Sequence, residues 1–388
     1  MPSRPSTGER TGAGRTPIRV VVVAHGPPMR GGISTVAMDI VDNEQLNAEF
    51  EVVFFNTSQN DDGRGEFGLE NIVRAFGHAW GTFRRAQRGS VVHTHSVQDP
   101  VFVAWRQVAI AAAARLRGAR VLLHNHGYLP YMNEPGRYRV GRAHRLAFRL
   151  LDRLCDANIV IGEAGIANLR PYMPHIELPV VHNSVVLDGV TPTSAVHDPP
   201  RILFIGELLE RKGLLVLLDA LDLLDESGRP YELVLVGDDT PGRDPDKDEM
   251  VRTITARGRS GALTGAIDRD EVYERLAGAD IFVLPTEYEG QPFTIIESLA
   301  AGVPIVASDI PAIASMITDG DNGTLVPWGD AAALHDAIVS LLEDPDERRR
   351  ISKLNRRAAH ERYDRSVFVE HLAALYHRSG RARGGAPR

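Results

Sequence analysis

The sequence predicts an α/β protein made of two doubly wound domains that face each other across a cleft. Short apolar runs alternate with longer helical patterns along the chain, as in IRVVVVA at Ile18–Ala24 and RILFIG at Arg201–Gly206. Nearly continuous apolar strands indicate parallel sheets that helices cover on both faces. Because 388 residues exceed what one ordinary core supports, two domains of about 180 residues are expected.

Nine strand patterns divide between the two halves of the chain. They lie at Ile18–Ala24, Glu51–Asn56, Ser90–His95, Ala119–Asn125 and Ala157–Gly162, and then at Arg201–Gly206, Tyr231–Gly237, Asp280–Pro285 and Val303–Ser308. The segment Asp188–Pro200, rich in proline and small polar residues, is predicted to link the halves. We place a first domain at residues 17–190 and a second at 198–362, with a ligand cleft between their strand ends. A helix at about 363–379 is a candidate to pack back on the first domain.

Composition narrows the class of protein. The formal charge is −7 without a dominant basic block, which argues against nucleic-acid binding. The single cysteine, Cys155, excludes an internal disulfide and is expected to be a small buried hydrophobe. Residues 1–16 lack the apolar core of a secretion signal and are predicted to be a disordered tail. The longest apolar run, Val108–Ala114, is too short to span a bilayer, which takes about 20 residues, so a soluble cytoplasmic protein is expected.

Two carboxylates in the stretch EYEGQPFTIIESLAAG point to a ligand site. A buried strand pattern precedes this stretch, and Pro292 and Gly302 suit the first position of a helix and the residue just past its end. The helix is therefore predicted at Phe293–Ala301. This placement leaves Glu289 in the loop at the cleft and Glu297 in the second turn of the helix.

The start of this helix suits an anion. The backbone N–H groups of Gln291, Phe293 and Thr294 are expected to be free there, and such groups favour a phosphate. Carboxylates accept hydrogen bonds from hydroxyl groups, which sugars and riboses present in pairs. The arrangement fits a nucleotide-sugar, with ribose at Glu297, diphosphate at the helix start and sugar at Glu289. The alternative is a surface acid and a helix acid placed near the helix dipole.

Two further loops follow strands and open helices. In PPMRGGIST, Gly31 and Gly32 let the backbone approach a phosphate or sugar, or else form a tight turn. The full G-x-G-x-x-G pattern is missing, so a nicotinamide cofactor is not expected. In GELLERKG, Arg211 and Lys212 would neutralise the charge of a departing diphosphate, whereas the alternative is a pair of solvated cations flanking Glu210.

Histidines end two strands of the first half. LHNHGY brings His124 and His126 to one strand end, and His93 and His95 end another strand. A metal site built from these imidazoles has weak support, because the sequence has no H-E-x-x-H pattern and no cysteine cluster. No metal is therefore expected.

The segment Arg137–Asp156 combines six arginines and His144 with a leucine-rich apolar side. This pattern is typical of a basic amphipathic helix at an anionic lipid surface. It also fits a helix that packs on its own sheet and leaves its arginines in water.

The ordered set of motifs resembles the retaining glycosyltransferases of the two-domain GT-B fold, specifically family 4. EGQPFTIIE has the E-x7-E spacing of that family, and ADIFVLPTEYEG, RILFIGELLERKG, VVHNSVVLD, LHNHG and a glycine-rich loop occur in the family's order, over about Ile18–Leu342. The resemblance implies two facing Rossmann-like domains, of which the first binds mainly the acceptor and the second the nucleotide-sugar. The sequence departs from the family at Glu207, where an arginine usually follows the glycine.

The resemblance also assigns roles to residues of the cleft. Arg211 and Lys212 would stabilise the leaving phosphate, while His126 and Glu289 would position the transferred sugar. The residues predicted to bind the donor are Gly31, Gly32, Gly290, Gln291, Pro292, Phe293, Thr294 and Glu297.

The implied reaction is metal-independent transfer of a sugar with retention of its anomeric configuration. The donor would be a UDP-sugar, with GDP-mannose next, and the acceptor a hydroxyl of a glycan or lipid-linked molecule in surface polysaccharide or glycolipid synthesis. No cofactor beyond the donor is expected, and peripheral contact with the inner face of the membrane would run through Arg137–Asp156. The alternatives are a same-fold epimerase or phosphorylase, and a non-catalytic nucleotide-sugar-binding regulatory subunit, which Glu207 would favour.

Overall fold

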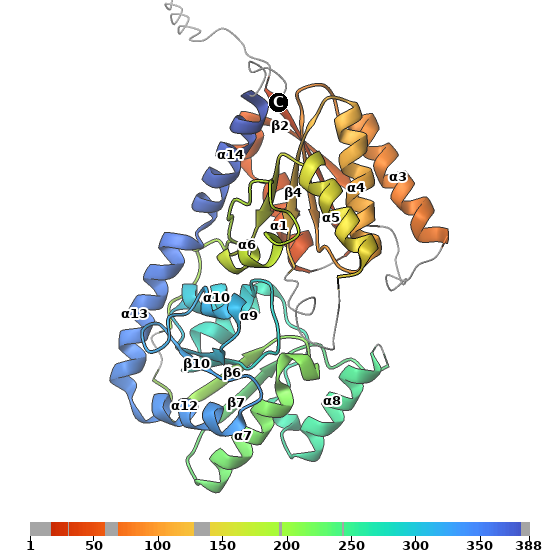
Figure 1. Ribbon diagram of the computed structural model, residues 1–388. Coiled ribbons are helices and arrows are strands. Elements are labelled where there is room, and N and C mark those ends of the chain that lie inside the picture. The colour runs from red at the N-terminus through yellow and green to blue at the C-terminus, as the bar shows by residue number, and fades with distance from the viewer. Residues whose placement is uncertain are drawn as a thin grey trace, which may run out of the picture.

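Two five-stranded parallel sheets form the framework of the protein (Figure 1). The computed structural model describes residues 17–29, 31–58, 69–127, 140–193, 196–242 and 244–381, so the tail predicted at 1–16 lies outside the described residues. The first sheet has the strand order β2-β1-β3-β4-β5 and the second β10-β9-β8-β6-β7. If β6–β10 are numbered 1 to 5 and the second sheet is read from β7, its order is 2-1-3-4-5, which is the order of the first sheet. The two domains therefore share one topology.

The first domain alternates strands and helices. Its elements are β1 (Ile18–Ala24), α1 (Gly32–Val41), α2 (Glu44–Glu49), β2 (Phe50–Asn56), α3 (Leu69–Arg85), β3 (Val91–Ser96), α4 (Val101–Leu116), β4 (Arg120–Asn125), α5 (Arg142–Leu154), β5 (Ala157–Val160) and α6 (Glu163–Leu169). The predicted basic helix is shorter than expected, because α5 begins at Arg142, and Arg137 and Arg139 lie outside the described residues. Cys155 is buried beside α5, as predicted.

The second domain and the C-terminal helices follow the same alternation. Their elements are β6 (Arg201–Ile205), α7 (Leu214–Glu226), β7 (Glu232–Val236), α8 (Pro245–Ala256), α9 (Arg269–Ala277), β8 (Ile281–Leu284), α10 (Phe293–Ala301), β9 (Ile305–Ser308), α11 (Pro311–Ala314), β10 (Thr324–Val326), α12 (Ala331–Glu343), α13 (Pro345–Arg362) and α14 (Arg365–Arg381). All nine predicted strands are present. The three-residue strand β10 was not predicted, because it is too short to show an alternating or continuous apolar pattern.

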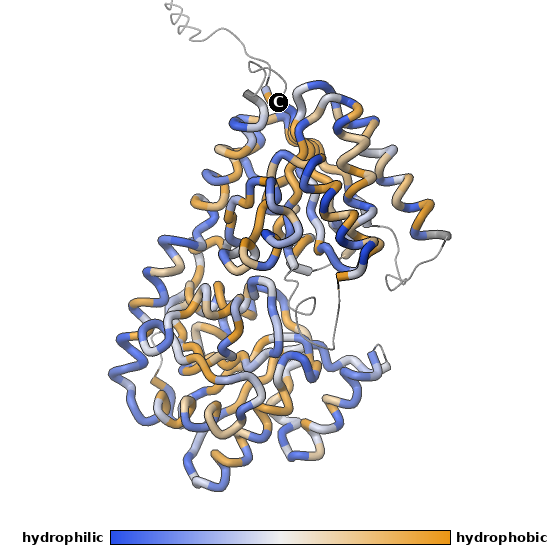
Figure 2. The backbone as a smooth tube through the Cα atoms, viewed as in Figure 1, coloured by the Kyte–Doolittle hydropathy of each residue, from blue (hydrophilic) through white to orange (hydrophobic). Residues whose placement is uncertain are grey.

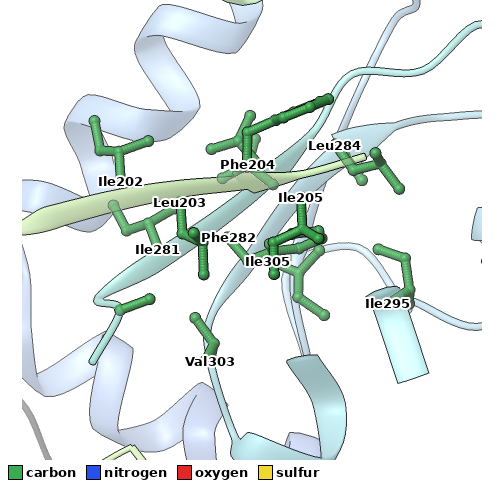
Figure 3. Close-up of a cluster of buried hydrophobic side chains, with 14 of the residues drawn as sticks. Ile202, Leu203, Phe204, Ile205, Ile281, Phe282, Leu284, Ile295, Val303 and Ile305 are labelled. Carbon is green, nitrogen blue, oxygen red and sulfur yellow. The ribbon is translucent and has the colours of Figure 1, made fainter. Parts of the chain in front are cut away.

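The core of the second domain consists of apolar side chains between the sheet and its helices. Ile202 and Phe204 on β6, Phe282 on β8 and Ile305 on β9 are fully buried, and Figure 3 shows them gathered with Ile295 from α10. The strands are apolar along their whole length because helices cover both faces of a parallel sheet. This packing holds the carboxyl ends of β6 and β8 side by side.

The chain crosses between the domains at two neighbouring places. Val185 donates its N–H to the carbonyl oxygen of Tyr363 at 2.9 Å and accepts from the N–H of Arg365 at 3.1 Å. The predicted linker Asp188–Pro200 lies later than this crossing, and Thr193 already donates its N–H to Ala301 of the second domain at 2.7 Å. The paired crossing ties both domains together at one edge.

Helix α14 returns to the first domain. Figure 1 shows α13 and α14 running in blue along one side of both domains. Phe368, Leu372 and Tyr376 of α14 are buried in the same cluster as Val20 and Val22 of β1. Arg365, at the start of α14, forms a 2.6 Å ion pair with Asp39 on α1. The last helix therefore belongs to the core of the first domain.

Candidate active site

The loops after β6 and β8 meet where the strand order of the second sheet changes direction. After β6 the chain continues to β7 on one side of the sheet order, and after β8 it continues to β9 on the other side. In such folds this divergence opens a crevice at the carboxyl ends of the two strands, where ligands bind. The carbonyl oxygen of Arg211 accepts hydrogen bonds from the N–H of Glu287 at 2.8 Å and from the hydroxyl of Thr286 at 3.1 Å. These bonds hold the two loops together.

Gly213 makes this close approach of the loops possible. Its φ is 76°, in the left-handed region, and a Cβ atom there would lie 1.9 Å from the carbonyl oxygen of Pro285. Only glycine avoids both the backbone strain and the overlap. The sequence GELLERKG therefore ends in glycine because the loop must pass directly against the end of β8.

Lys212 and Glu289 form an ion pair inside the crevice. The ammonium group of Lys212 donates to Oε1 of Glu289, and the Thr286 hydroxyl lies 3.4 Å from the same oxygen. The two side chains are only 14% and 12% exposed. The structure thus brings together two of the residues predicted to be catalytic, one from each loop. Their opposite charges stabilise each other in this partly buried position.

Arg211 points into a different pair. Its guanidinium donates to Oε2 of Glu207, four residues earlier, and lies 5.4 Å from the ring centre of Tyr288. Glu207 is 62% exposed, so this pair is in contact with water and contributes little to stability. Glu207 therefore pairs with Arg211, whereas Lys212 pairs with Glu289.

Helix α10 begins at the edge of the same crevice. It runs from Phe293 to Ala301 as predicted, with Gly302 as a left-handed C-cap at φ 75°. Pro292 is the N-cap and not the first helical residue, which corrects the predicted position by one residue. Among the described residues, no acceptor bonds the N–H groups of Phe293 and Thr294, so these donors are available to an anion.

Glu297 lies in the second turn of α10 and is 7% exposed. Burial raises the pKa of its carboxyl group, and the charge of Arg269 partly opposes this shift. The Nε atom of Arg269, at the start of α9, is 3.7 Å from Oε1 of Glu297. Sequence reasoning missed Arg269, because nothing in its local pattern shows that α9 packs against α10.

Three of the predicted donor-binding residues contact the first domain directly. A Cβ atom on Gly290 would lie 2.8 Å from the carbonyl oxygen of His126, and one on Gly32 would lie 3.5 Å from the Phe293 ring. The side-chain oxygen of Gln291 accepts the N–H of Asn183 at 2.6 Å, and its amide nitrogen is 2.9 Å from His182. The side chain of Gln291 is therefore engaged in the contact between the domains.

The glycine-rich loop after β1 faces this contact. Gly31 has a φ of 147°, and a Cβ atom there would have no heavy atom of the described residues within 4 Å, so the space beside it is open. Gly32 begins α1 and lies against Phe293. The loop thus brings backbone without side chains to the wall opposite α10, where a ligand could approach it closely.

Four histidines of the first domain form a stack at the ends of β3 and β4. Nδ1 of His95 is 2.9 Å from Nε2 of His126, and Nε2 of His93 is 3.3 Å from Nδ1 of His124. The ring centres of His124 and His126 lie 4.2 Å apart. Nδ1 of His93 is 2.7 Å from the hydroxyl oxygen of Tyr376 on α14, a partner that sequence reasoning did not find.

Burial keeps this stack uncharged. It lowers the pKa of His93 and His126 to about 3, with the neighbouring rings adding to the shift for His93. The pKa values of His95 and His124 also lie well below the ordinary value, again mainly because of burial. At neutral pH these imidazoles can exchange hydrogen bonds with hydroxyl groups but cannot supply positive charge.

Within the described part of the chain, three of these histidines bring their ring nitrogens close enough together to be considered as ligands of a metal ion. Ligand atoms of His93, His95 and His124 lie within 4.8 Å of one another. Both nitrogens of His93 are already hydrogen-bonded, and in this group only Nε2 of His95 and Nε2 of His124 have no partner among the described residues. A three-nitrogen site would therefore have to break an existing hydrogen bond.

The segment predicted to face lipid, Arg137–Asp156, contains the basic helix α5 at Arg142–Leu154. On α5, Arg142, Arg145, Arg149 and Arg153 are exposed, while Phe148 and neighbouring apolar residues are buried against the sheet. Both of the arrangements considered for this sequence are compatible with that geometry. Among the described residues, no helix is both long and apolar enough to cross a membrane.

Known proteins share both the sequence and the fold of this chain. Residues 192–358 match the family model described as glycosyl transferases group 1. The chain is 26% identical to the alpha-D-kanosaminyltransferase of Streptomyces kanamyceticus over 68% of its own length and 61% of the relative. It is 33% identical to the phosphatidyl-myo-inositol mannosyltransferase of Mycobacterium leprae over 52% of its length and 53% of that protein. The matches thus span about half to three-fifths of these curated relatives.

Solved structures match over nearly the whole chain. Sucrose-phosphate synthase from Thermosynechococcus elongatus superposes with a TM-score of 0.73 at 18% identity, covering 93% of this chain and 98% of that one. Anabaena HepE, in complex with UDP and glucose, gives a TM-score of 0.70 at 16% identity over 92% and 99% of the two chains. These likenesses confirm the predicted GT-B fold.

Proposed function

Because residues 192–358 belong to the glycosyl transferases group 1, we propose that the protein transfers a sugar from a nucleotide-diphosphate sugar to a hydroxyl group of an acceptor. The observation that carries this proposal is the crevice at the ends of β6 and β8. It places the Lys212–Glu289 pair beside the free N–H groups that open α10. A cation and a helix N-terminus suit a diphosphate, and the carboxylate suits a sugar hydroxyl.

The donor would lie along α10. Glu297 accepts hydrogen bonds from the ribose hydroxyls, the N–H groups of Phe293 and Thr294 bind the diphosphate, and Lys212 neutralises its charge. The sugar then lies between Glu289 and the neutral His126. A UDP-sugar is favoured, with GDP-mannose as the second candidate. Anabaena HepE, which shares the fold, binds UDP and glucose, and the mycobacterial relatives are mannosyltransferases by name.

The reaction would keep the anomeric configuration and need no metal ion. The bond between the anomeric carbon and the diphosphate oxygen breaks, and the acceptor oxygen bonds to the same face of that carbon. The proton of the acceptor hydroxyl passes to the leaving phosphate, so charge and atoms balance. Lys212 and Arg211 stabilise that phosphate, which is the electrostatic role expected of preorganised cations. Closing of the two domains around the donor would exclude water from the site, and the close approach of Gly290 to the backbone of His126 supports this.

The acceptor would be a glycan or a lipid-linked molecule bound by the first domain, in surface polysaccharide or glycolipid synthesis. The protein would work in the cytoplasm, with peripheral contact to the inner face of the membrane through the exposed arginines of α5. The mycobacterial relatives support a lipid acceptor, because their names include phosphatidyl-myo-inositol. Hydroxyl recognition also suits a wall of uncharged imidazoles.

A second candidate is a nucleotide-sugar-binding subunit without transfer activity. The pairing of Arg211 with Glu207 favours it, since a carboxylate beside the phosphate site reduces the positive charge there. The two candidates share the donor site and differ in turnover.

Calorimetric titration with UDP-, GDP- and ADP-sugars tests the donor site first. We expect one nucleotide to bind and Glu297→Ala to weaken its binding, while the control Asp336→Ala at an exposed acid on α12 leaves it unchanged. Binding without transfer to any acceptor would select the non-catalytic candidate. Absence of binding for all three donors would overturn both.

A further inference from the structure

Helices α3, α4 and α5 cover the face of the first sheet opposite α1 and α14. Helix α4 packs against both α3 and α5, so the three form one layer. The inner side of this layer is buried in one apolar cluster, with Ile110 of α4 and Phe148 of α5 among its members. Figure 1 shows the layer in orange and yellow, with α3 as the outermost helix.

Helix α3 exposes a row of large apolar side chains. Ile72, Val73, Phe76 and Trp80 are 43%, 69%, 71% and 62% exposed. Because Ile72, Phe76 and Trp80 are spaced four residues apart, they lie on one face of the helix. Figure 2 shows hydrophobic residues interspersed with hydrophilic ones along α3, as in an amphipathic helix. Large exposed apolar rows on a monomer indicate an interaction surface.

This row is not needed to attach α3 to its own domain. The opposite face of the helix makes that contact, since His78 and Thr82 are 7% and 0% exposed. A Cβ atom on Gly81 would lie 2.2 Å from the Phe55 ring, so the helix backbone already packs closely on β2. The exposed row, at whose end Trp80 stacks on Phe83 at 5.6 Å, therefore lies on the side of α3 that faces away from this contact.

The layer that carries the row is strongly basic. Helices α3, α4 and α5 contain nine arginines and two acids, a formal charge of +7 in a chain whose formal charge is −7. One of the two acids, Asp152, is turned inward, where its carboxylate accepts the N–H groups of His175 and Ile176. Positive charge is thus concentrated in the helical layer that carries the exposed apolar row, although Arg115 is already paired with Asp156 at 3.1 Å.

We propose that α3 and α5 dock the first domain on an anionic lipid bilayer. The apolar row of α3 enters the boundary between headgroups and acyl chains, and the exposed arginines of α5 contact lipid phosphates. An apolar face flanked by arginines is the pattern of helices that lie in a membrane interface, and tryptophan is enriched there. Anionic headgroups attract the positive charge of this helical layer, whereas a neutral partner would gain no electrostatic attraction from it.

Docking in this way would bring the cleft to the membrane surface. In a parallel α/β domain the helices run opposite to the strands, so α3 and α5 begin at the edge of the sheet where the strands end. His126 follows the last residue of β4 at that edge. A lipid-linked acceptor would then reach the histidine stack without leaving its bilayer, a consequence that rests on the proposed transfer reaction.

Sedimentation with lipid vesicles tests the docking itself. We expect binding to vesicles of phosphatidylcholine mixed with phosphatidylglycerol and weak binding to phosphatidylcholine alone. The double variant Phe76→Ser/Trp80→Ser should partition about tenfold or more less well, because two aromatic side chains no longer leave water. The control Trp328→Ser removes a 49% exposed tryptophan of the second domain and should change nothing.

The charge contribution is tested separately. Arg145→Gln and Arg149→Gln should each weaken binding to anionic vesicles by about fivefold, since each arginine near such a surface is worth about 1 kcal/mol. Arg252→Gln on α8, at an exposed arginine paired with Glu249, is the matched control. In a protein carrying Trp105→Phe and Trp328→Phe, the emission of Trp80 should shift to the blue when anionic vesicles are added.

Three results would overturn the proposal. The double variant could bind as tightly as the parent, or the parent could fail to bind anionic vesicles. The third is a dimer in light scattering that Phe76→Ser/Trp80→Ser dissociates, which would assign the row to a second copy of the chain. Nucleotide-sugar titration and transfer to a soluble acceptor should be equal in all these variants, so failure of docking is distinguishable from failure of the proposed reaction.

Discussion

The two domains have the same strand order but place different chemistry at the cleft. In the second domain, the loops at the switch point carry charges in pairs, Lys212 with Glu289 and Arg211 with Glu207. In the first domain, the strand ends carry a buried stack of neutral histidines. The strand ends of the second domain therefore suit a charged phosphate, and those of the first domain suit uncharged hydroxyl groups.

The comparison shows how one topology serves two kinds of ligand. Strand order determines where the loops meet, and each loop then determines what they bind. Helix α14 adds to the asymmetry, because its Tyr376 contacts His93 from a distance of 283 residues in the sequence. The histidine wall depends on the C-terminal helix, whereas the charged pairs depend only on two neighbouring loops.

Removing the charge at Lys212 should have the largest effect on the donor side. We expect Lys212→Ala to lower the transfer rate about 10²–10³-fold, as loss of a preorganised electrostatic donor does. Lys353→Ala, at an exposed lysine on α13, is the control. Steady-state rates with the best donor measure the effect, and an unchanged turnover would remove Lys212 from the mechanism.

Glu297 offers a test in which binding and stability move in opposite directions. We expect Glu297→Gln to weaken donor binding about 10–100-fold, because hydrogen bonds to a charged group are worth about 1.5–3 kcal/mol. Burial raises the pKa of this carboxyl group, so the folded protein disfavours its ionised form. Stability is therefore lost as pH rises from the pKa of the unfolded chain through the higher pKa of the folded protein. The glutamine variant should therefore be at least as stable as the parent at neutral pH.

Calorimetric titration and urea unfolding at pH 7 measure the two quantities on the same samples. A variant that binds the donor normally would contradict the assigned role of Glu297. A variant that is less stable at neutral pH would show that Arg269 outweighs the cost of burial.

Much of the candidate site in the second domain could be predicted from the sequence, because local signals coincide there. Phe293–Ala301 was predicted with correct ends, since Pro292 and Gly302 mark them chemically. Glu289 and Lys212 lie in loops that follow recognisable strands, so their meeting follows from the order of a parallel sheet. The pairing of Glu207 with Arg211 could be expected from their i,i+4 spacing, although this spacing does not show that Lys212 pairs separately with Glu289.

The first domain and its contacts with the second were harder to predict, because these contacts are between residues that are distant in the sequence. No local pattern connects Tyr376 with His93, or Gln291 with Asn183, because the two members of each pair are far apart in the sequence and meet only when the chain has folded. The exposed row on α3 has the period of an ordinary amphipathic helix. Only the structure shows that the side of α3 that faces the sheet is the one with His78 and Thr82, and not the apolar row.

The histidine stack gives the first domain its own pH dependence. His126 is neutral in the folded protein because burial lowers its pKa to about 3, whereas in the unfolded chain it titrates near 6.5. The unfolded state therefore binds more protons between these values, and stability falls as pH drops from about 6.5 towards 3.

His126→Gln should make this loss of stability less steep. The change in slope is at most about 1.4 kcal/mol per pH unit, the value for one proton. Urea unfolding at a series of pH values between neutrality and mild acid measures it. Equal slopes in the parent and the variant would show that folding does not lower the pKa of His126.

The smallest expected effect concerns Glu207, the exposed acid that pairs with Arg211. Glu207→Gln removes the partner of Arg211 and one negative charge near the diphosphate site. Because Glu207 is 62% exposed, water and salt screen its charge, and we expect donor binding to tighten only about two- to fivefold. The gain should shrink as salt is added, and Glu210→Gln, at the neighbouring acid, serves as the control. Weaker binding in Glu207→Gln would mean that this acid holds Arg211 in the orientation that meets the phosphate. In that case the second domain would use a carboxylate to position its cation, as it already does with Glu289 and Lys212.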